Sequence, residues 1–160
     1  MFNVTVLAMG KLKERFYTQA AEEYAKRLSG YCKFQLLELP EYRLPEDPSP
    51  AQIAEGLGRE AQVIREKLPK GAWFCVLTPE GKKLSSEAFA RTLAEVKTGG
   101  RSSACFLLGS SFGIAPEIKA MADLRLSFSD MTFPHHLARV MLLEQIYRAE
   151  SIQAGSRYHK

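Results

Sequence analysis

The sequence is poor in cysteine and has no long hydrophobic run. Its three cysteines, Cys32, Cys75 and Cys105, form no Cys-x-x-Cys motif and cannot all pair, so neither a disulfide framework nor a zinc site is expected. No run approaches the roughly 18 apolar residues of a membrane span. At the N-terminus the basic residues follow the apolar run, whereas in a signal peptide they precede it. We therefore expect a cytoplasmic protein with no membrane partner.

The chain also lacks a strong excess of charge and the common phosphate-binding loops. Lys and Arg number 22 against 18 Asp and Glu, and the net charge of +4 is by itself weak evidence for a polyanionic partner. The glycine-rich turn LLGSSFGI is not G-x-G-x-x-G, and no G-K-[ST] follows a strand. A length of 160 residues suits one core and is too short for two, so we expect a single domain spanning residues 1–160.

Hydrophobic periodicity predicts that strands and helices alternate along the chain. Apolar or β-branched runs predict five strands, at residues 2–9, 33–39, 72–78, 103–109 and 124–129. Helical spacing and capping residues predict five helices, at residues 14–28, 51–68, 85–96, 115–122 and 133–151. Such alternation is typical of an α/β fold, a mostly parallel sheet with helices on both faces. In these folds, ligands bind at the carboxyl ends of the strands.

Polar segments with turn residues follow three of the expected strands. They read LTPEGKKLSS (77–86), LLGSSFGI (107–114) and SFSDMTFPHH (127–136). Each has a plain structural interpretation: the first two are typical of turns, Thr132 suits a helix cap and Pro134 suits a first helical turn. His135 and His136 are adjacent and point to different faces, so no metal site is expected. Because the three segments leave strands of one sheet, together they predict one pocket.

The order of these segments resembles the small SPOUT methyltransferases of the RlmH type. The resemblance lies in VLTPEGKKLSSEAFA, FLLGSSFGI, LSFSDMTFPHHLARVMLLEQIYRA and the terminal Tyr-His-Lys, and it covers nearly the whole chain. It implies a SPOUT fold with a C-terminal trefoil knot and a homodimer packed through that knot. It also implies S-adenosyl-L-methionine as cofactor and methylation of N3 of a pseudouridine in 23S (large-subunit) ribosomal RNA. Because no separate RNA-binding domain is expected, the assembled ribosome is the expected substrate.

The resemblance further implies which residues form the site. The expected cofactor contacts are Leu77, Gly109, Phe128, Ser129, Asp130, Met131, Thr132 and Phe133. For the acceptor, His159 is the candidate base, because an imidazole titrates near neutral pH. Tyr158 would orient the target base by stacking, and Arg148 or Arg157 would stabilise the anionic ring. Ser110 departs from the family, which usually has a second glycine after Gly109.

A dimer is also favoured by the composition of the last expected helix. Leu137, Val140, Met141 and Tyr147 add more apolar surface than one small domain has to bury beside its sheet. A self-complementary patch about a two-fold axis is the common way to cover such a surface.

Two other interpretations stay open on the sequence. One is a different nucleotide-cofactor α/β enzyme of Rossmann type, and the other is a non-catalytic ribosome-associated module that keeps the fold. The intact loop at residues 126–133 and the terminal Tyr-His-Lys favour an active enzyme over the module.

Overall fold

The computed structural model describes all 160 residues and contains one five-stranded sheet. All neighbouring strands are parallel, in the order β2-β1-β4-β3-β5. The strands are β1 (Asn3–Met9), β2 (Lys33–Leu39), β3 (Trp73–Lys83), β4 (Ser103–Leu108) and β5 (Leu124–Ser127). The helices are α1 (Arg15–Leu28), α2 (Pro50–Lys67), α3 (Ser86–Thr98), α4 (Pro116–Met121) and α5 (His135–Gln153). The predicted parallel α/β fold is confirmed.

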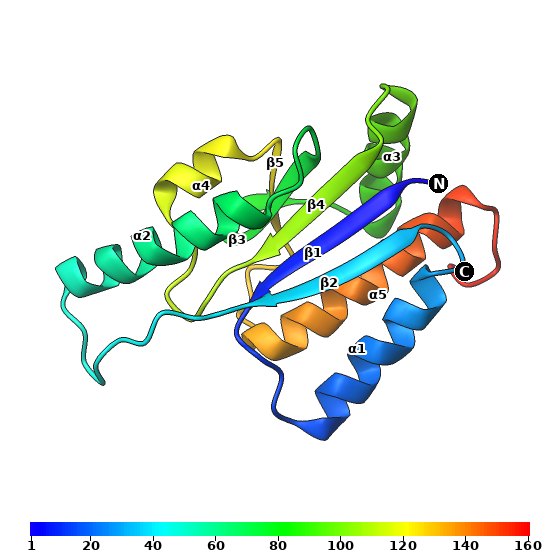
Figure 1. Cartoon of the computed structure of the whole chain (residues 1–160). Helices are drawn as coiled ribbons and strands as arrows, with labels where there is room; N and C mark the ends of the chain where they lie inside the picture. Colours follow the sequence, from blue (N-terminus) through cyan, green and yellow to red (C-terminus); the bar gives the residue numbers. More distant parts are fainter.

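Helices cover both faces of the sheet, as predicted (Figure 1). Residues of α1, α3 and α5 join one hydrophobic cluster, and residues of α2 and α4 join a second one on the opposite face. The strand β1 shows the division, because Val4 and Val6 belong to the first cluster while Leu7 and Met9 belong to the second. Burial on both faces explains why the strands are hydrophobic without alternation.

Capping residues set the starts of α2 and α3. Ser49 Oγ accepts a hydrogen bond from Gln52 N at 3.2 Å, and Gln52 Oε1 accepts one from Ser49 N at 2.8 Å, which completes a capping box. Ser85 Oγ caps α3 by accepting from Ala88 N at 3.1 Å. The prediction that Thr132 caps the last helix is wrong. That helix starts at His135 after an N-cap proline with no side-chain cap, so the threonine lies too far upstream.

The third strand extends farther than the sequence predicts. β3 was expected to end before a Pro-Glu-Gly turn, but it continues to Lys83 and pairs with β5 on both sides of a register shift. At Gly81 the two backbones approach so closely that a Cβ would lie 2.7 Å from the carbonyl carbon of Leu126. The expected turn is therefore an irregularity inside a paired strand, because pairing with β5 overrides the local turn preference.

The last helix is apolar on more than one face. Its buried residues are Arg139, Leu142, Leu143, Ile146, Ala149, Glu150 and Ser151. The stripe that includes Leu137, Val140 and Met141 is only half-buried, because α5 turns its other face to the sheet. The half-buried stripe stays accessible to a partner.

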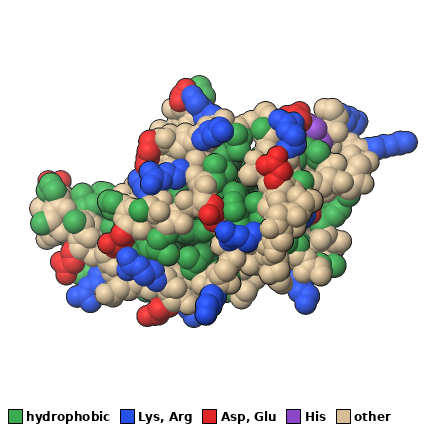
Figure 2. Space-filling view, turned by 90° about the horizontal axis from the view of Figure 1, so that it is seen from above, with side chains coloured by type: hydrophobic (Ala, Val, Ile, Leu, Met, Phe, Trp, Pro, Cys, Tyr) green, Lys and Arg blue, Asp and Glu red, His purple; other side chains and the backbone are tan.

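The surface is mixed in character. Seen from above the view of Figure 1, hydrophobic side chains gather in a hollow near the middle of the molecule, with Lys, Arg, Asp and Glu around them (Figure 2). The two chain ends lie on the same side of the molecule (Figure 1). None of the helices combines the length and the apolar character that crossing a membrane requires.

Candidate active site

Two of the three polar segments identified in the sequence leave β4 and β5 at one end of the sheet, and the third continues β3 beside β5 as far as Lys83. In the strand register, Leu77 of β3 pairs with Leu108 of β4 on one side and with Leu126 of β5 on the other. Gly109 directly follows β4, and Phe128 directly follows β5. The structure therefore places Leu77, Gly109 and Phe128 on three adjacent strands near the carboxyl ends of β4 and β5, where α/β folds bind ligands.

In the turn after β4, close contacts leave no room for a side chain at Gly109. A Cβ on Gly109 would lie 2.5 Å from the carbonyl oxygen of Gly113 and 2.6 Å from Ile114 Cγ1. Gly113 has a φ of +93°, and no non-glycine residue has a positive φ. Ser110, where the family usually has glycine, is thus compatible with the backbone, and its hydroxyl donates to Glu60 Oε1 at 2.9 Å.

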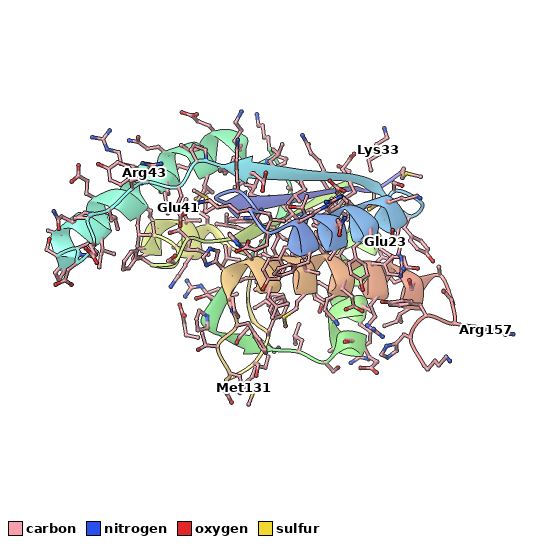
Figure 3. All side chains as sticks on the ribbon, turned by 90° about the horizontal axis from the view of Figure 1, so that it is seen from below. Glu23, Lys33, Glu41, Arg43, Met131 and Arg157 are labelled. Atoms are coloured by element: carbon pink, nitrogen blue, oxygen red, sulfur yellow. The ribbon has the colours of Figure 1, made fainter.

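The segment 128–133 forms a projecting loop with Met131 near its tip (Figure 3). Ser129 organises the loop, because its carbonyl accepts from Ser127 Oγ at 3.1 Å and its hydroxyl accepts from Met131 N at 3.0 Å. Lys83 Nζ donates to Asp130 Oδ2 at 2.7 Å, which ties the loop to the end of β3. Phe128 packs against the core. Thr132 is exposed and Phe133 is half-buried.

A buried hydroxyl lies beside Leu77. Thr78 is 5% exposed, and its side chain interacts with Glu80, which helps to lower the pKa of that carboxylate. Thr78 lines neither of the two cavities described below.

A cavity of about 430 Å³ connects the end of β5 with the middle of α5. Ser127 and Phe128 line it on the side of the projecting loop, and Ser86 and Gln145 line it on the side of α3 and α5. Ser86 Oγ donates to Gln145 Oε1 at 2.7 Å, which fixes the start of α3 against α5. Glu144 also lines the cavity, whereas Leu77 and Gly109 do not.

Glu144 joins this cavity to the C-terminal residues. Arg148 donates to Glu144 Oε1 from Nε at 2.9 Å and from Nη2 at 2.6 Å, and the Tyr158 hydroxyl donates to the same oxygen at 3.2 Å. His159 Nδ1 lies 3.0 Å from Arg148 Nη1, and His159 Nε2 lies 2.8 Å from Glu87 Oε1. The structure therefore brings the three candidate catalytic residues together and holds the tail against α3 and α5 without a partner.

The protonation of this cluster follows from its donors. The guanidinium of Arg148 contains only N–H donors, so it must donate to His159 Nδ1. The neutral imidazole then carries its proton on Nε2 and donates to Glu87. The hydrogen bond from His159 lowers the pKa of Glu87. Burial, with further contributions from Tyr24 and Glu144, raises the pKa of Tyr158 to about 12, so its phenol stays protonated. Arg148 also lies over the Tyr158 ring, with Cζ 4.8 Å from the centroid.

Arg157, the alternative to Arg148, is exposed and lies at the edge of the molecule (Figure 3). Its side chain makes no hydrogen bond or ion pair, in contrast to the multiple contacts of Arg148. The geometry favours Arg148 as the cation beside His159.

The sequence analysis missed a buried arginine beside the site. Arg139, 1% exposed, donates to Glu38 Oε2 at 2.7 Å and to the carbonyl oxygens of Met9 at 3.3 Å and Gly10 at 3.0 Å. It ties the start of α5, just after the projecting loop, to the ends of β1 and β2. Helical spacing places it on the same face as the buried Leu143, four residues on, and that spacing is a signal for burial.

Together, fold and site define an α/β protein whose ligand site is built from loops at the carboxyl ends of a parallel sheet. No group of three His, Cys, Asp or Glu side chains is placed to hold a metal ion. The family model described as Predicted SPOUT methyltransferase matches residues 2–159. The chain belongs to this family of SPOUT methyltransferases, as the sequence motifs predicted.

Named relatives match the chain over its whole length. It is 41% identical over 158 residues to the Ribosomal RNA large subunit methyltransferase H of Clostridioides difficile, covering 99% of each chain. It is 41% identical over 160 residues to the protein of the same name from Moorella thermoacetica, covering 100% of each. The crystal structure of tRNA (m1G37) methyltransferase from Aquifex aeolicus is similar with a TM-score of 0.55, over 92% of this chain and 69% of that one. At 13% identity, that likeness shows the fold alone.

Proposed function

We propose that the protein transfers a methyl group from S-adenosyl-L-methionine to N3 of a pseudouridine in large-subunit ribosomal RNA, in the cytoplasm and on the assembled ribosome. The observation that carries the proposal is the cavity between Phe128 and Glu144, because the expected cofactor loop lies at one end and the cluster of Tyr158 and His159 adjoins the other. The two relatives named for ribosomal RNA methylation, each 41% identical over the full chain, support the substrate class.

Leu77, Gly109 and residues 128–133 would hold the cofactor. The cavity of about 430 Å³ fits this role, because Ser127 and Phe128 give it polar and aromatic surface beside the loop. When bound, the cofactor supplies a methyl group on a positively charged sulfur, which a nitrogen can displace in line. The protein then acts mainly by aligning the two reactants, which can contribute several kcal/mol.

The terminal cluster would handle the proton on N3 of the target base. His159 can accept a proton only through Nδ1, and Arg148 occupies that lone pair in this conformation. A base role therefore requires the tail to leave Arg148 when RNA binds. Once free, the Arg148 guanidinium would stabilise the anion that forms on the ring as the proton leaves. Tyr158, which stays protonated, would orient the base by stacking or by donating a hydrogen bond.

A homodimer and a single domain, residues 1–160, are part of the proposal. The half-buried stripe of α5 that includes Val140 and Met141 is the surface expected at the two-fold axis. The trefoil knot is likewise expected at this end of the fold. A net charge of +4 would hold naked RNA weakly and with strong salt dependence, which favours an assembled ribosome as the substrate.

Deleting residues 158–160 tests the proposal. The affinity for S-adenosyl-L-methionine, measured by calorimetry, should stay nearly unchanged, while methylation of ribosomes should be abolished. His159→Ala alone should lower the rate by roughly 10²-fold if it is the general base. High pH should partly restore that rate, because N3 then loses its proton unaided. Mass mapping of ribosomal RNA nucleosides reads out the product.

The outcomes separate the alternatives. If the truncated protein methylates ribosomes at the full rate, the tail has no role in the acceptor site. Binding of NAD without S-adenosyl-L-methionine would support a different nucleotide-cofactor enzyme. Tight binding of S-adenosyl-L-methionine with no methylation of ribosomes in any assembly state would support the non-catalytic module.

A further inference from the structure

A second, larger cavity also lies at the carboxyl ends of the strands, but on the other side of β4. It measures about 640 Å³ and opens at the ends of β1 and β2, between the segment that leads into α2 and the turn after β4. None of the expected cofactor residues and none of the terminal cluster lines it. It touches the first site only through the turn that follows Gly109, where Ser110 and Phe112 line its wall.

The cavity is fixed from inside by a buried carboxylate. Glu60 of α2 is 5% exposed, and it accepts from the backbone N–H of Tyr42 at 3.0 Å and from the hydroxyl of Ser110 at 2.9 Å. Two walls from distant parts of the chain are thereby held to one helix. On the same helix, a Cβ at Gly56 would lie 3.1 Å from Tyr42 Cδ1 and from Leu44 Cδ2, so the glycine allows this segment to pack closely.

The rim of the cavity combines exposed aromatic and cationic side chains. Tyr42 is 40% exposed and Phe112 is 48% exposed, on opposite walls, and the two rings do not stack on each other. Lys11, Lys13 and Arg43 are exposed and form no ion pair within the chain. Figure 3 shows Arg43 on the segment between β2 and α2.

The acids of the cavity limit what it can bind. Glu38 is paired with Arg139 at 2.7 Å, so the free carboxylates of the rim are Glu41 and Glu46. Three free cations therefore face two free acids, and Glu60 stands on the floor. This balance disfavours a compact polyphosphate, which would place several negative charges next to those carboxylates. A nucleotide within a strand carries one charge on its backbone and an uncharged base, so the charge can stay at the rim.

We propose that this cavity binds an unpaired nucleotide of the substrate RNA, away from the nucleotide that is methylated. Aromatic side chains stack on unpaired bases, and lysine and arginine contact the backbone phosphates. Tyr42 and Phe112 provide the stacking surfaces, and Lys11, Lys13 and Arg43 provide the phosphate contacts. Glu60 uses one lone pair on each oxygen for Tyr42 and Ser110, and its remaining lone pairs accept from a base amino group. The inference rests on the proposed function only in that RNA is the substrate.

Two substitutions at the rim test the inference, with one matched control elsewhere. Tyr42→Ala removes a stacking surface but keeps the backbone N–H that Glu60 binds, and Lys13→Ala removes one cation. Lys70→Ala removes another exposed lysine, also without an ion pair, at the opposite end of the strands, just before β3. Thermal denaturation checks that all three variants fold, which exposed positions should allow.

Binding of a 5′-labelled, single-stranded RNA dodecamer is measured by fluorescence anisotropy, and the KM for ribosomes is measured with the intact protein. Tyr42→Ala should weaken both about tenfold, the effect of losing one stacked base. Lys13→Ala should weaken both and lower the slope of log affinity against log salt by about one. Lys70→Ala should change neither, and the affinity for S-adenosyl-L-methionine should be unchanged in all three variants.

Photo-crosslinking of 4-thiouridine-substituted dodecamer to the wild-type protein identifies the contact. Crosslinks to Tyr42 or Phe112 would support the inference. If Tyr42→Ala and Lys13→Ala bind RNA and methylate ribosomes as the wild type does, the cavity binds no RNA, and the proposed function still stands. If the wild type binds the dodecamer through this cavity but never methylates ribosomes, the inference stands and the proposed function fails. Crosslinking on the ribosome to a protein instead of RNA would overturn the inference.

Discussion

Replacing the buried Arg139 by methionine should destabilise the fold by an amount that the structure allows us to work out. The guanidinium donates to Glu38 Oε2 at 2.7 Å and to two backbone carbonyl oxygens, of Met9 at 3.3 Å and Gly10 at 3.0 Å. Methionine keeps most of the apolar stem and removes every donor. The variant therefore isolates the polar contacts from the packing.

The expected cost is the balance of three terms. A hydrogen bond between charged groups contributes about 1.5–3 kcal/mol, and each carbonyl that loses its donor costs about 1 kcal/mol. Against this, burial of a guanidinium is itself unfavourable: it lowers the pKa of Arg139, and Arg139 Nε has no partner at all. Glu38 is 34% exposed, so water can solvate it once the arginine is gone. We expect a net loss of about 3 kcal/mol, or about 9 °C in Tm for a chain of this size.

Urea denaturation of Arg139→Met, Glu38→Gln and the double variant gives the coupling between the two side chains, and thermal denaturation gives the change in Tm. Arg91→Met is the matched control, because Arg91 is exposed and forms no ion pair, and it should change stability by less than about 0.5 kcal/mol. The reasoning is refuted if Arg139→Met is as stable as the wild type. In that case the desolvation of the buried arginine cancels its hydrogen bonds, and the ends of β1 and β2 are held to α5 by packing alone.

Three further predictions follow from other parts of the structure. Met141→Glu, on the half-buried stripe of α5, should convert a dimer into monomers in sedimentation at micromolar concentration, and a wild-type monomer there would contradict the proposed dimer. Burial raises the pKa of Cys32 to about 11 and of Cys105 to about 12, and raises that of Cys75 further, so Ellman's reagent should label no thiol at pH 8 before denaturation and three thiols after it. Hydrogen bonds from Lys119 first and Thr78 second hold the pKa of Glu80 at about 2, below its ordinary 4.5, so these contacts stabilise the fold above pH 4.5 and lose their effect as the pH falls toward 2. Lys119→Met should raise the Glu80 pKa part of the way toward 4.5 in an NMR titration, and an unchanged value would show that Lys119 is not the largest cause.

Most of the fold could be predicted because its local signals agree with its tertiary contacts. Continuous apolar runs became strands buried on both faces, and Ser49 and Ser85 cap the helices they precede. Where the two levels conflict, the prediction failed. Pro79, Glu80 and Gly81 favour a turn locally, yet pairing with β5 keeps them inside β3. No local window contains that information, because the partner strand lies more than 40 residues away in the sequence.

The same distinction between local signals and tertiary contacts applies to the candidate site. Its three polar segments could be placed together from the sequence, because neighbouring parallel strands end on the same side of a sheet. The polar contacts inside it could not, since His159 and Glu87 are 72 residues apart and Arg139 and Glu38 are 101 apart. Yet periodicity does place Arg139 on the same helical face as Leu142 and Leu143, and a charge on a core face requires a partner of opposite sign. That requirement could have been stated from the sequence, but which acid meets it depends on how far β2 extends toward α5, and only the assembled sheet fixes that distance.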